Sequence, residues 1–213
     1  MSDGHETGIS DCVVYVVDDD ASMREALDSL LRSAGWQVQA FAGVADFVSA
    51  PRSPLPSCIV LDVSMPGDSG LDLQHSLNEL GDRTPVVFMT GHGDIEMSVK
   101  AMKAGASDFL AKPFREQRML DAVAQALRHD ASQVTERTQL GEWRRRIGTL
   151  SPREREVMRR VVRGMLNRKI AAELQIAEIT VKVHRRHVMD KMGAHSLAEL
   201  VRMVDRAEPS LVA

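Results

Sequence analysis

Residues 12–20 read CVVYVVDDD, an apolar run that ends directly in three aspartates. An apolar run without alternation is typical of a strand that is buried on both faces of a sheet. Four further segments have a strand-like pattern: 37–41 (QVQAF), 57–63 (SCIVLDV), 85–89 (PVVFM) and 108–111 (DFLA). The first half of the sequence therefore predicts five strands.

The segments that follow these strands are amphipathic and predict helices. They cover residues 23–33, 45–48, 71–80, 95–104 and 115–129. In the helix at 71–80, we expect Leu73, Leu77 and Leu80 to face inward. Buried strands that alternate with helices favour a parallel sheet covered on both faces, in a doubly wound α/β domain.

Polar side chains stand at the carboxyl ends of four of the predicted strands. They are Asp18, Asp19 and Asp20, followed along the chain by Asp62, Thr90 and Lys112. Because the carboxyl ends of parallel strands meet at one crevice, we expect these side chains to converge. Clustered carboxylates repel one another unless a cation lies among them, and Mg²⁺ accepts aspartate oxygens as ligands.

These residues allow two interpretations. Taken singly, each belongs to an ordinary turn after a strand. Taken together, a carboxylate beside a metal ion, a hydroxyl and an ammonium group can accept a phosphoryl group, which makes Asp62 a candidate nucleophile. Four such groups in register at one edge of the sheet favour the second interpretation.

The formal net charge of −3 conceals an uneven distribution along the 213 residues. Residues 1–140 contain 11 Lys and Arg against 21 Asp and Glu, a balance of −10, whereas residues 141–213 contain 16 against 9, a balance of +7. A basic segment of this kind is the electrostatic footprint of a nucleic-acid binder. Two domains with unequal solvated surfaces would give the same numbers, so charge alone leaves both interpretations open.

We expect neither a membrane-spanning segment nor a secretory signal in this sequence. No apolar run approaches the roughly 20 residues needed to cross a bilayer. The first twenty residues include Asp3, Glu6 and Asp11 and lack the basic start of a secretory signal. Cys12 and Cys58 lie in apolar segments and form neither a disulfide framework nor a zinc motif, which favours a reducing cytoplasm.

The second half predicts four helices after a polar stretch. Residues 129–148 are polar and charged and predict a linker, either a flexible tether or a continuation of the preceding helix. Residues 151–154 (SPRE) then supply an N-cap serine, a proline at the first helical position and a capping-box glutamate. That helix ends near Gly164, and the next three are expected at 167–174, 178–192 and 196–206.

The helix at 178–192 (EITVKVHRRHVMDKM) has two distinct faces. Val181, His184, Val188 and Met192 form a stripe that faces the core. Lys182, Val183 and Arg186 fall on the opposite side, where a valine can touch a thymine methyl group while the cations reach guanine or phosphates. A solvated basic helix with one stray valine would have the same pattern. The preceding short helix favours a helix-turn-helix.

Residues 12–128 resemble the receiver domain of two-component response regulators. The matching motifs are VVDDD (16–20), VLDVSMPGDSG (60–70), FMTGHGD (88–94) and AMKAGASDFLAKPF (101–114). The resemblance implies a flavodoxin-like fold with a parallel five-stranded sheet. It also implies that Asp62 accepts a phosphoryl group and that Mg²⁺ is bound by Asp18, Asp19, Asp62 and the Ser64 carbonyl. The hydroxyl of Thr90 and the ammonium group of Lys112 are implied to contact the phosphoryl group. Phe109 is implied to be an aromatic switch, and the Lys112-Pro113 bond is expected to be cis.

Ser64 argues against a rival class of protein. Haloacid dehalogenase-type phosphatases also form an aspartyl phosphate, but they need a second aspartate two residues after the first, where this chain has Ser64. We therefore expect a regulator that accepts a phosphoryl group and not an enzyme. Ser64 and His92 are expected near the entrance to Asp62, where they could tune loss of the phosphoryl group; an exposed loop position is favoured for His92.

Residues 149–206 resemble the four-helix LuxR/NarL-type DNA-binding domain. The matching stretches are 150–174, 180–192 and 196–203. The resemblance implies base contacts from Lys182, Val183 and Arg186, and phosphate contacts from Asn167, Lys169, Thr180, His187 and Lys191. His184 matches a packed position and is expected to be a hydrogen-bonded core histidine. Ala177 departs from the family, whose members usually cap this helix with Ser or Thr.

The two resemblances together point to FixJ-type response regulators. They divide the chain into an N-terminal tail (1–11), a receiver domain (12–128), a linker (129–148), a DNA-binding domain (149–206) and a C-terminal tail (207–213). The implied partners are a sensor histidine kinase, double-stranded promoter DNA, a second copy of the chain after phosphorylation, and RNA polymerase as a candidate. A phosphorylation-independent DNA-binding regulator whose receiver only dimerises is the alternative.

Overall fold

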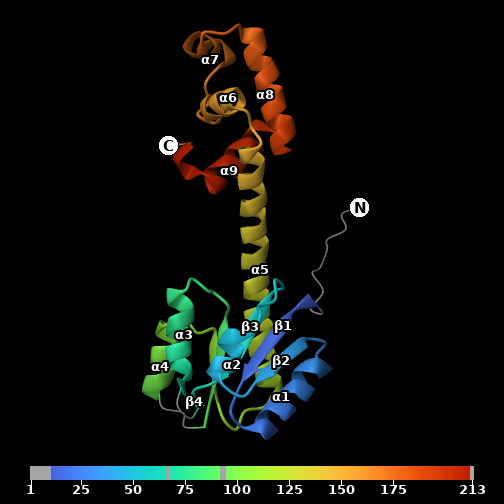
Figure 1. Cartoon of the computed structure of the whole chain (residues 1–213), viewed down its shortest axis with the longest axis vertical. Coiled ribbons are helices and arrows are strands. Elements are labelled where there is room, and N and C mark those ends of the chain that lie inside the picture. The colour runs from blue at the N-terminus through green and yellow to red at the C-terminus, as the bar shows by residue number, and fades with distance from the viewer. Residues whose placement is uncertain (1–10, 66–67, 92–94, 212–213) are drawn as a thin grey trace. The chain divides into compact units, whose positions relative to one another are not determined.

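The computed structural model describes residues 11–65, 68–91 and 95–211. The chain forms two compact units, Met1–Val134 and Thr135–Ala213 (Figure 1). Each unit has its own hydrophobic core, so each is described by itself. Among the described residues, no helix combines the length and the apolar character that crossing a bilayer requires.

The sheet of the first unit has five parallel strands in the order β2-β1-β3-β6-β7. Their bounds are Val13–Val17 (β1), Gln37–Phe41 (β2), Ser57–Asp62 (β3), Val86–Thr90 (β6) and Asp108–Ala111 (β7). This order is that of the flavodoxin-like doubly wound fold, as expected. All residues of β1, β3 and β6 are buried, and their sequences are accordingly almost continuously apolar.

Helices cover both faces of the sheet (Figure 1). Their bounds are Ala21–Ser33 (α1), Val44–Ser49 (α2), Gly70–Glu79 (α3), Ile95–Lys103 (α4) and Glu116–Gly148 (α5). Neighbouring residues of β1 serve the two layers in turn: Val14 packs in one core with Leu31 of α1 and Val123 of α5, whereas Tyr15 packs in the other with Phe47 of α2. The alternation follows from the period of two residues along a strand.

A buried aspartate of α5 reaches the start of β3. Asp130 is 4% exposed, and its Oδ2 accepts a hydrogen bond of 2.8 Å from the backbone N–H of Ser57. Cys12 and Cys58 are free and buried, and burial raises the pKa of each thiol. Thiols of this kind are poor nucleophiles, because the thiolate is the reactive form.

Two details of the first unit differ from the sequence-based expectations. Ser64–Met65 (β4) and Asp68–Ser69 (β5) form a short antiparallel ladder that was not predicted, because two-residue strands leave no periodic signal. Leu80, which was expected to face inward, is 80% exposed. Leu80 is the C-cap residue of α3 and follows the last helical residue, so it does not continue the buried face of the helix.

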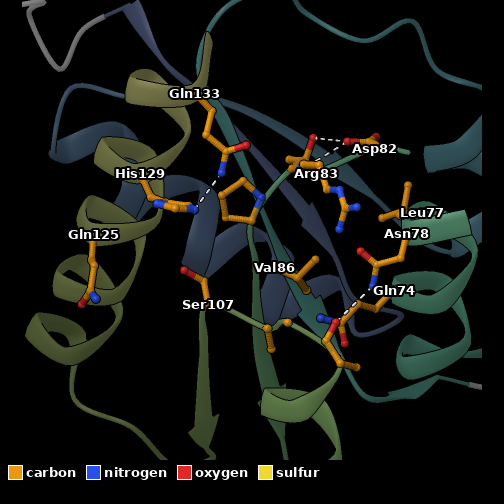
Figure 2. Close-up of a pocket in the computed structure, with 15 residues that line it drawn as sticks. Gln74, Leu77, Asn78, Asp82, Arg83, Val86, Ser107, Gln125, His129 and Gln133 are labelled. Atoms are coloured by element: carbon orange, nitrogen blue, oxygen red, sulfur yellow. Dashed lines mark hydrogen bonds between the residues drawn. The ribbon is translucent and has the colours of Figure 1, made fainter. Parts of the chain in front are cut away.

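An open hollow of about 800 Å³ lies at the amino-terminal edge of β6 and β7 (Figure 2). Its walls come from the ends of α3 and α4 and from one face of α5. This edge of the sheet is opposite to the edge where the strands end in Asp62, Thr90 and Lys112.

Residues 129–148 are helical throughout, as the continuation of α5. The boundary between the two compact units falls within this helix. The sequence allowed either a flexible tether or a continuation of the preceding helix for residues 129–148, and the structure has the helix. The limits of the linker and of the two domains stay predictions.

The second unit contains the end of α5 and four further helices. These are Pro152–Val162 (α6), Asn167–Leu174 (α7), Glu178–Met192 (α8) and Leu197–Ala207 (α9), followed by a 3-10 turn at Pro209–Leu211 (η2). The predicted capping box is present: Glu154 N–H donates to Ser151 Oγ, and Ser151 N–H donates to Glu154 Oε2. Val181, Val188 and Met192 of α8 are buried in the core, as their spacing indicated.

Candidate functional site

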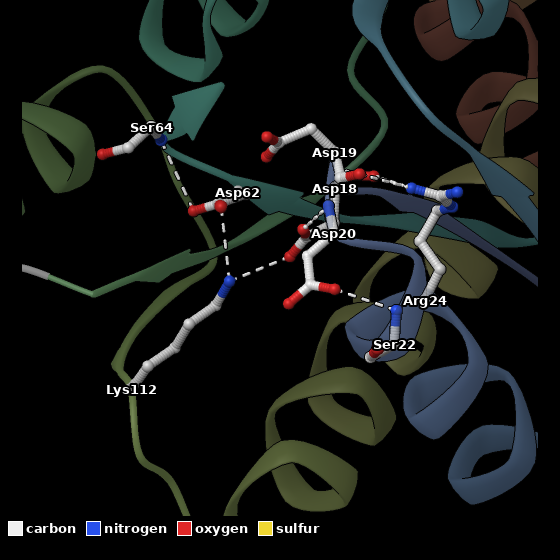
Figure 3. Close-up of polar contacts among 8 residues, drawn as sticks. All are labelled: Asp18, Asp19, Asp20, Ser22, Arg24, Asp62, Ser64 and Lys112. Atoms are coloured by element: carbon white, nitrogen blue, oxygen red, sulfur yellow. Dashed lines mark hydrogen bonds and ion pairs between the residues drawn. The ribbon is translucent and has the colours of Figure 1, made fainter. Parts of the chain in front are cut away.

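Lys112 joins the aspartates at the carboxyl edge of the sheet (Figure 3). Its Nζ atom lies 2.9 Å from Asp18 Oδ2 and 3.3 Å from Asp62 Oδ2. Asp18 directly follows β1, Asp62 ends β3, and Lys112 directly follows β7. Three side chains from distant parts of the sequence therefore meet, as the strand-end argument predicted.

Asp18, Asp19 and Asp62 form an acidic cluster. Each can offer one carboxylate oxygen, and these atoms all lie within 4.8 Å of one another. Asp18 and Asp62 are buried, whereas Asp19 is exposed and leaves the cluster open to solvent. A set of three carboxylate oxygens with an open side fits a hard cation that keeps several of its waters.

Asp20 has a different role from the two aspartates before it. Its Oδ1 accepts a hydrogen bond of 2.9 Å from Ser22 N–H, which caps the start of α1. Its own N–H donates to Asp18 Oδ1 at 2.9 Å. The third aspartate of the run thus begins the helix and fixes the second buried oxygen of Asp18.

Arg24 is a site residue that the sequence analysis missed. Its Nη1 donates to the backbone carbonyl of Asp18 at 2.8 Å and to that of Asp19 at 2.9 Å. These bonds hold the turn between β1 and α1 that carries both aspartates. An arginine in the first turns of an amphipathic helix resembles a solvated side chain, and no motif distinguishes the two.

The charge of Lys112 is favoured by its neighbours. Partial burial lowers the pKa of this ammonium group, but the hydrogen bond to Asp18 and the charges of Asp18 and Asp62 outweigh burial, so the pKa lies above its ordinary value. Lys112 is therefore a fixed cation at neutral pH.

Thr90 lies on β6, which pairs with β3, and Phe109 lies on β7, which pairs with β6. Thr90 is fully buried at the end of β6, and its carbonyl accepts a hydrogen bond of 2.7 Å from Lys112 N–H. Phe109 of β7 is half-buried, with its ring centroid 6.4 Å from that of Phe88. The Lys112-Pro113 bond is cis, as expected.

The backbone around Asp62 is close to the start of α3. Ser64 N–H lies 3.4 Å from Asp62 Oδ1. A Cβ atom on Gly70 would lie only 2.5 Å from the backbone oxygen of Asp62, so any side chain at this position would displace one of the two segments. Gly70 belongs to the quoted receiver motif, but sequence analysis gave it no role. His92 lies outside the described residues.

In the second unit, α7 and α8 form the predicted helix-turn-helix. Lys182, Val183 and Arg186 are exposed on α8, and Val183 is 46% exposed. Lys182 Nζ lies 3.5 Å from Glu178 and Arg186 Nε 3.9 Å from Asp190. Such surface pairs are weak and leave both cations available to a ligand.

The residues expected at phosphates have different surroundings. Lys169 is exposed, Thr180 is half-buried, and Asn167 Oδ1 accepts a hydrogen bond of 3.2 Å from Arg185. Lys191 and His187 both contact the buried carboxylate of Glu154, at 2.7 and 3.6 Å.

Glu154 links the start of α6 to α8. The hydrogen bond from Lys191 lowers the pKa of this carboxyl group; burial opposes that effect, and bonds from Ser151 add to it, which leaves the pKa at about 2. The carboxylate therefore stays ionised and holds Lys191 in place. The sequence predicted the capping box of Glu154, but it did not predict the ion pair between Glu154 and Lys191.

Two expectations about α8 have different outcomes. Ala177 is the N-cap residue and makes no side-chain hydrogen bond, as its side chain implied. The expectation that His184 is a hydrogen-bonded core residue was wrong. His184 is half-buried, and its Nδ1 atom has no hydrogen-bond partner among the described residues.

Two protein-family models match this chain. The response regulator receiver domain matches residues 14–124. The bacterial regulatory proteins of the luxR family match residues 148–204. One of the two matches lies in each compact unit.

Similar proteins match over nearly the whole length. Nodulation protein W of Bradyrhizobium diazoefficiens is 48% identical over 200 residues, which are 94% of this chain and 88% of that protein. Response regulator protein TodT of Pseudomonas putida is 45% identical over 199 residues (93% and 88%). Transcriptional regulatory protein FixJ of B. diazoefficiens is 41% identical over 194 residues (91% and 95%).

A solved structure has the same organisation. The response regulator StyR has a TM-score of 0.84 and 46% sequence identity, and the match covers 92% of this chain and 99% of StyR. Full-length FixJ from B. japonicum has a TM-score of 0.54 and 40% sequence identity, and the match covers 92% of this chain and 96% of FixJ. The chain therefore belongs to the two-component response regulators of the FixJ type, which join a receiver domain to a LuxR-type DNA-binding domain.

Proposed function

We propose that a sensor histidine kinase phosphorylates this regulator on Asp62 and that phosphorylation raises its affinity for promoter DNA. The observation that supports the proposal best is the contact of Lys112 Nζ with both Asp18 and Asp62 beside an open acidic cluster. A buried carboxylate that touches a fixed cation and faces a cation site has the surroundings that a phosphoryl acceptor needs.

The proposed reaction transfers a phosphoryl group from a kinase histidine. An oxygen of Asp62 attacks phosphorus, the new O–P bond forms as the P–N bond breaks, and the imidazole leaves with the bonding electrons and takes up a proton. Asp18, Asp19, Asp62 and the Ser64 carbonyl would hold Mg²⁺, which would supply positive charge beside the phosphoryl group. Lys112 stays charged and pairs with one of them.

Thr90 and Phe109 are proposed to pass the change to the surface of the receiver. The Thr90 hydroxyl would follow the new phosphoryl oxygens, and Phe109 would turn inward from its half-buried position. This rearrangement shifts a pre-existing equilibrium towards a form that dimerises, so the unphosphorylated protein keeps weak DNA binding.

The proposed DNA contacts lie on α7 and α8. Lys182, Val183 and Arg186 would read bases in the major groove, and their exposure supports this role. The proposed phosphate contacts are Asn167, Lys169, Thr180, His187 and Lys191. A dimer would place two such helices on a roughly two-fold symmetric promoter site, in the cytoplasm, where RNA polymerase is a candidate partner.

The experiment that tests this proposal measures the intact mass of the full chain after incubation with acetyl phosphate and Mg²⁺. We expect wild type to gain one phosphoryl group and Asp62→Asn to gain none. DNA selected by the phosphorylated protein from a random pool then serves as a probe in fluorescence anisotropy. No gain by wild type, no binding of beryllofluoride, and equal DNA affinity of both proteins would favour the phosphorylation-independent alternative.

A further inference from the structure

The hollow at the amino-terminal edge of β6 and β7, here called the basal pocket, is large enough for a small molecule. Its volume of about 800 Å³ falls within the range of roughly 300–1,000 Å³ that is typical of ligand sites. Pro85 and Val86 line it at the start of β6, and Ser107 lines it just before β7. The cation site and the phosphoryl acceptor lie at the opposite edge of the sheet.

The walls of the basal pocket are mainly polar (Figure 2). Side-chain amides, hydroxyls and an imidazole line it: Gln74, Asn78, Thr84, Ser107, Gln125, His129 and Gln133. Some of these groups bind one another or the backbone, since Asn78 donates to the Ala104 carbonyl and Gln133 contacts His129 at 2.7 Å. A wall of this composition suits a polar ligand.

One acceptor in this wall lacks a donor. Gln74 is 3% exposed, and no described residue donates a hydrogen bond to its Oε1 atom. Buried polar atoms are almost always hydrogen-bonded, so an exception calls for a partner that is not part of the chain. The partner must carry an N–H or O–H group.

One cation of the pocket also lacks a partner. Asp82 is engaged, because its carboxylate accepts from Thr84 at 2.6 Å and pairs with Arg52 at 3.2 Å. Arg83 is exposed and takes part in no hydrogen bond or ion pair among the described residues. Its guanidinium group is therefore available to a carboxylate, for which its planar geometry is well suited.

The ends of two helices influence which donor fits. Both α3 and α4 end at the basal pocket, at Glu79 and Lys103. The carbonyl end of a helix carries partial negative charge and favours a cation. An ammonium group in the basal pocket could donate to the unpaired Gln74 amide oxygen, and the charge of the helix ends favours such a cation.

We propose that the basal pocket binds a small organic carboxylate that carries an amino or hydroxyl group. The carboxylate pairs with Arg83, and the amino or hydroxyl group donates to Gln74 Oε1. This binding goes beyond the proposed function, because neither residue belongs to the phosphorylation site or to the DNA-binding helix.

The test titrates the full chain with compounds that share a carbon skeleton. L-aspartate, L-malate and succinate differ only in an amino, a hydroxyl or no substituent at one carbon, and glutamate, 2-hydroxyglutarate and glutarate repeat the series with one more carbon. Calorimetry measures affinity, and amide NMR shifts locate the site. Mg²⁺ is omitted with EDTA present, since these acids chelate it.

The substituted acid of at least one series is expected to bind about tenfold more tightly than its unsubstituted member, as one added hydrogen bond allows. The amide shifts are expected at Ser107 and Ala106. Gln74→Leu should abolish the difference within the series, and Arg83→Gln should weaken every member. Arg128→Gln, an exposed arginine of α5 outside the pocket, is the control and should change nothing.

Three outcomes would overturn the proposal: no binding by any of the six acids, equal binding within both series, or shifts confined to the edge around Asp62. Each variant is also labelled with acetyl phosphate and Mg²⁺. Gain of one phosphoryl group shows that the receiver is folded, so failure of the basal pocket and failure of the proposed phosphorylation are distinguishable. If Gln74→Leu does not fold, the affinity of Arg83→Gln, a substitution at an exposed position, still tests whether the acids bind in the basal pocket.

Discussion

Arg24 holds the aspartate turn through two backbone carbonyls and touches neither carboxylate. The position of the acidic oxygens therefore depends on a residue that binds no ligand itself. Hydrogen bonds from a charged donor each contribute about 1.5–3 kcal/mol. Loss of these bonds would let the turn move while the aspartates keep their charge.

At this site we expect Arg24→Ala to need roughly tenfold more Mg²⁺ for half-maximal labelling by acetyl phosphate, as the loss of one such bond implies. The measurement is the extent of phosphorylation by intact mass across a Mg²⁺ titration. Arg32→Ala is the matched control, because Arg32 lies at the other end of α1 and donates to the Val38 carbonyl there. An unchanged Mg²⁺ requirement for Arg24→Ala would show that the turn holds without it.

The sequence predicted the site residues that stand at the carboxyl ends of strands. It did not predict the residues that contact backbone carbonyl groups of the site. Asp18, Asp62 and Lys112 could be placed together from the sequence alone, because parallel strands place their carboxyl ends at one edge. Arg24 and Gly70 act through contacts with carbonyl groups. Such contacts depend on the path of the chain in space and leave no spacing pattern.

At the scale of an element, Gly70 sets how closely α3 can approach the end of β3. Gly70→Ala should destabilise the protein by about 1–3 kcal/mol, because its Cβ would lie 2.5 Å from the Asp62 carbonyl oxygen. Gly141→Ala should instead stabilise it by about 0.5–1 kcal/mol, since Gly141 is in α5 with nothing within 4 Å of an added Cβ. Urea unfolding followed by circular dichroism measures both changes. A shift of the same sign in both variants would contradict the close approach.

Glu154 makes the stability of the second unit depend on pH. Its folded-state pKa of about 2 lies below the ordinary 4.5, so the ionised form stabilises the fold above pH 4.5, and that contribution disappears as the pH falls towards 2. We expect Glu154→Gln to be less stable than wild type at neutral pH, with the difference shrinking over this interval. Trp143 fluorescence in a Trp36→Phe background reports unfolding of this unit. A constant difference across the interval would argue against the ion pair with Lys191.

The elements themselves were largely readable from the sequence. The strands at 37–41 and 108–111 and the helices at 167–174 and 178–192 have the predicted bounds. The two helices do so although their N-cap residues, Leu166 and Ala177, make no side-chain hydrogen bond. The β4–β5 ladder was missed, because it is too short for a periodic pattern. The form of residues 129–148 stayed open, because their polar composition suits both an exposed helix and a tether.

On the scale of the whole molecule, the two units carry opposite charge, with balances of −10 over residues 1–140 and +7 over 141–213. The basic part suits a polyanion, and the acidic part repels one. Binding to DNA is therefore expected to depend on how phosphorylation changes self-association, since two copies bring two basic units to one site.

Phosphorylation should tighten self-association by about 5- to 150-fold, the usual strength of coupling between two sites in a protein. Sedimentation velocity of the full chain, with and without acetyl phosphate and Mg²⁺, measures the dissociation constant of the dimer. Asp62→Asn is the control and should sediment alike in both conditions. If the dissociation constant of wild type does not change either, phosphorylation must act on DNA binding by another route.

The hydrogen bond between Asp130 and Ser57 joins positions that are 73 residues apart. Met119 and Val123, on the turns of α5 before Asp130, fill one of the two layers that cover the sheet. Domains generally fold during synthesis as their last segment leaves the ribosome. The receiver core can therefore close only after residue 130 has emerged. A nascent chain that stops before α5 keeps α1 on this face of the sheet but exposes the part that α5 covers to chaperones and proteases.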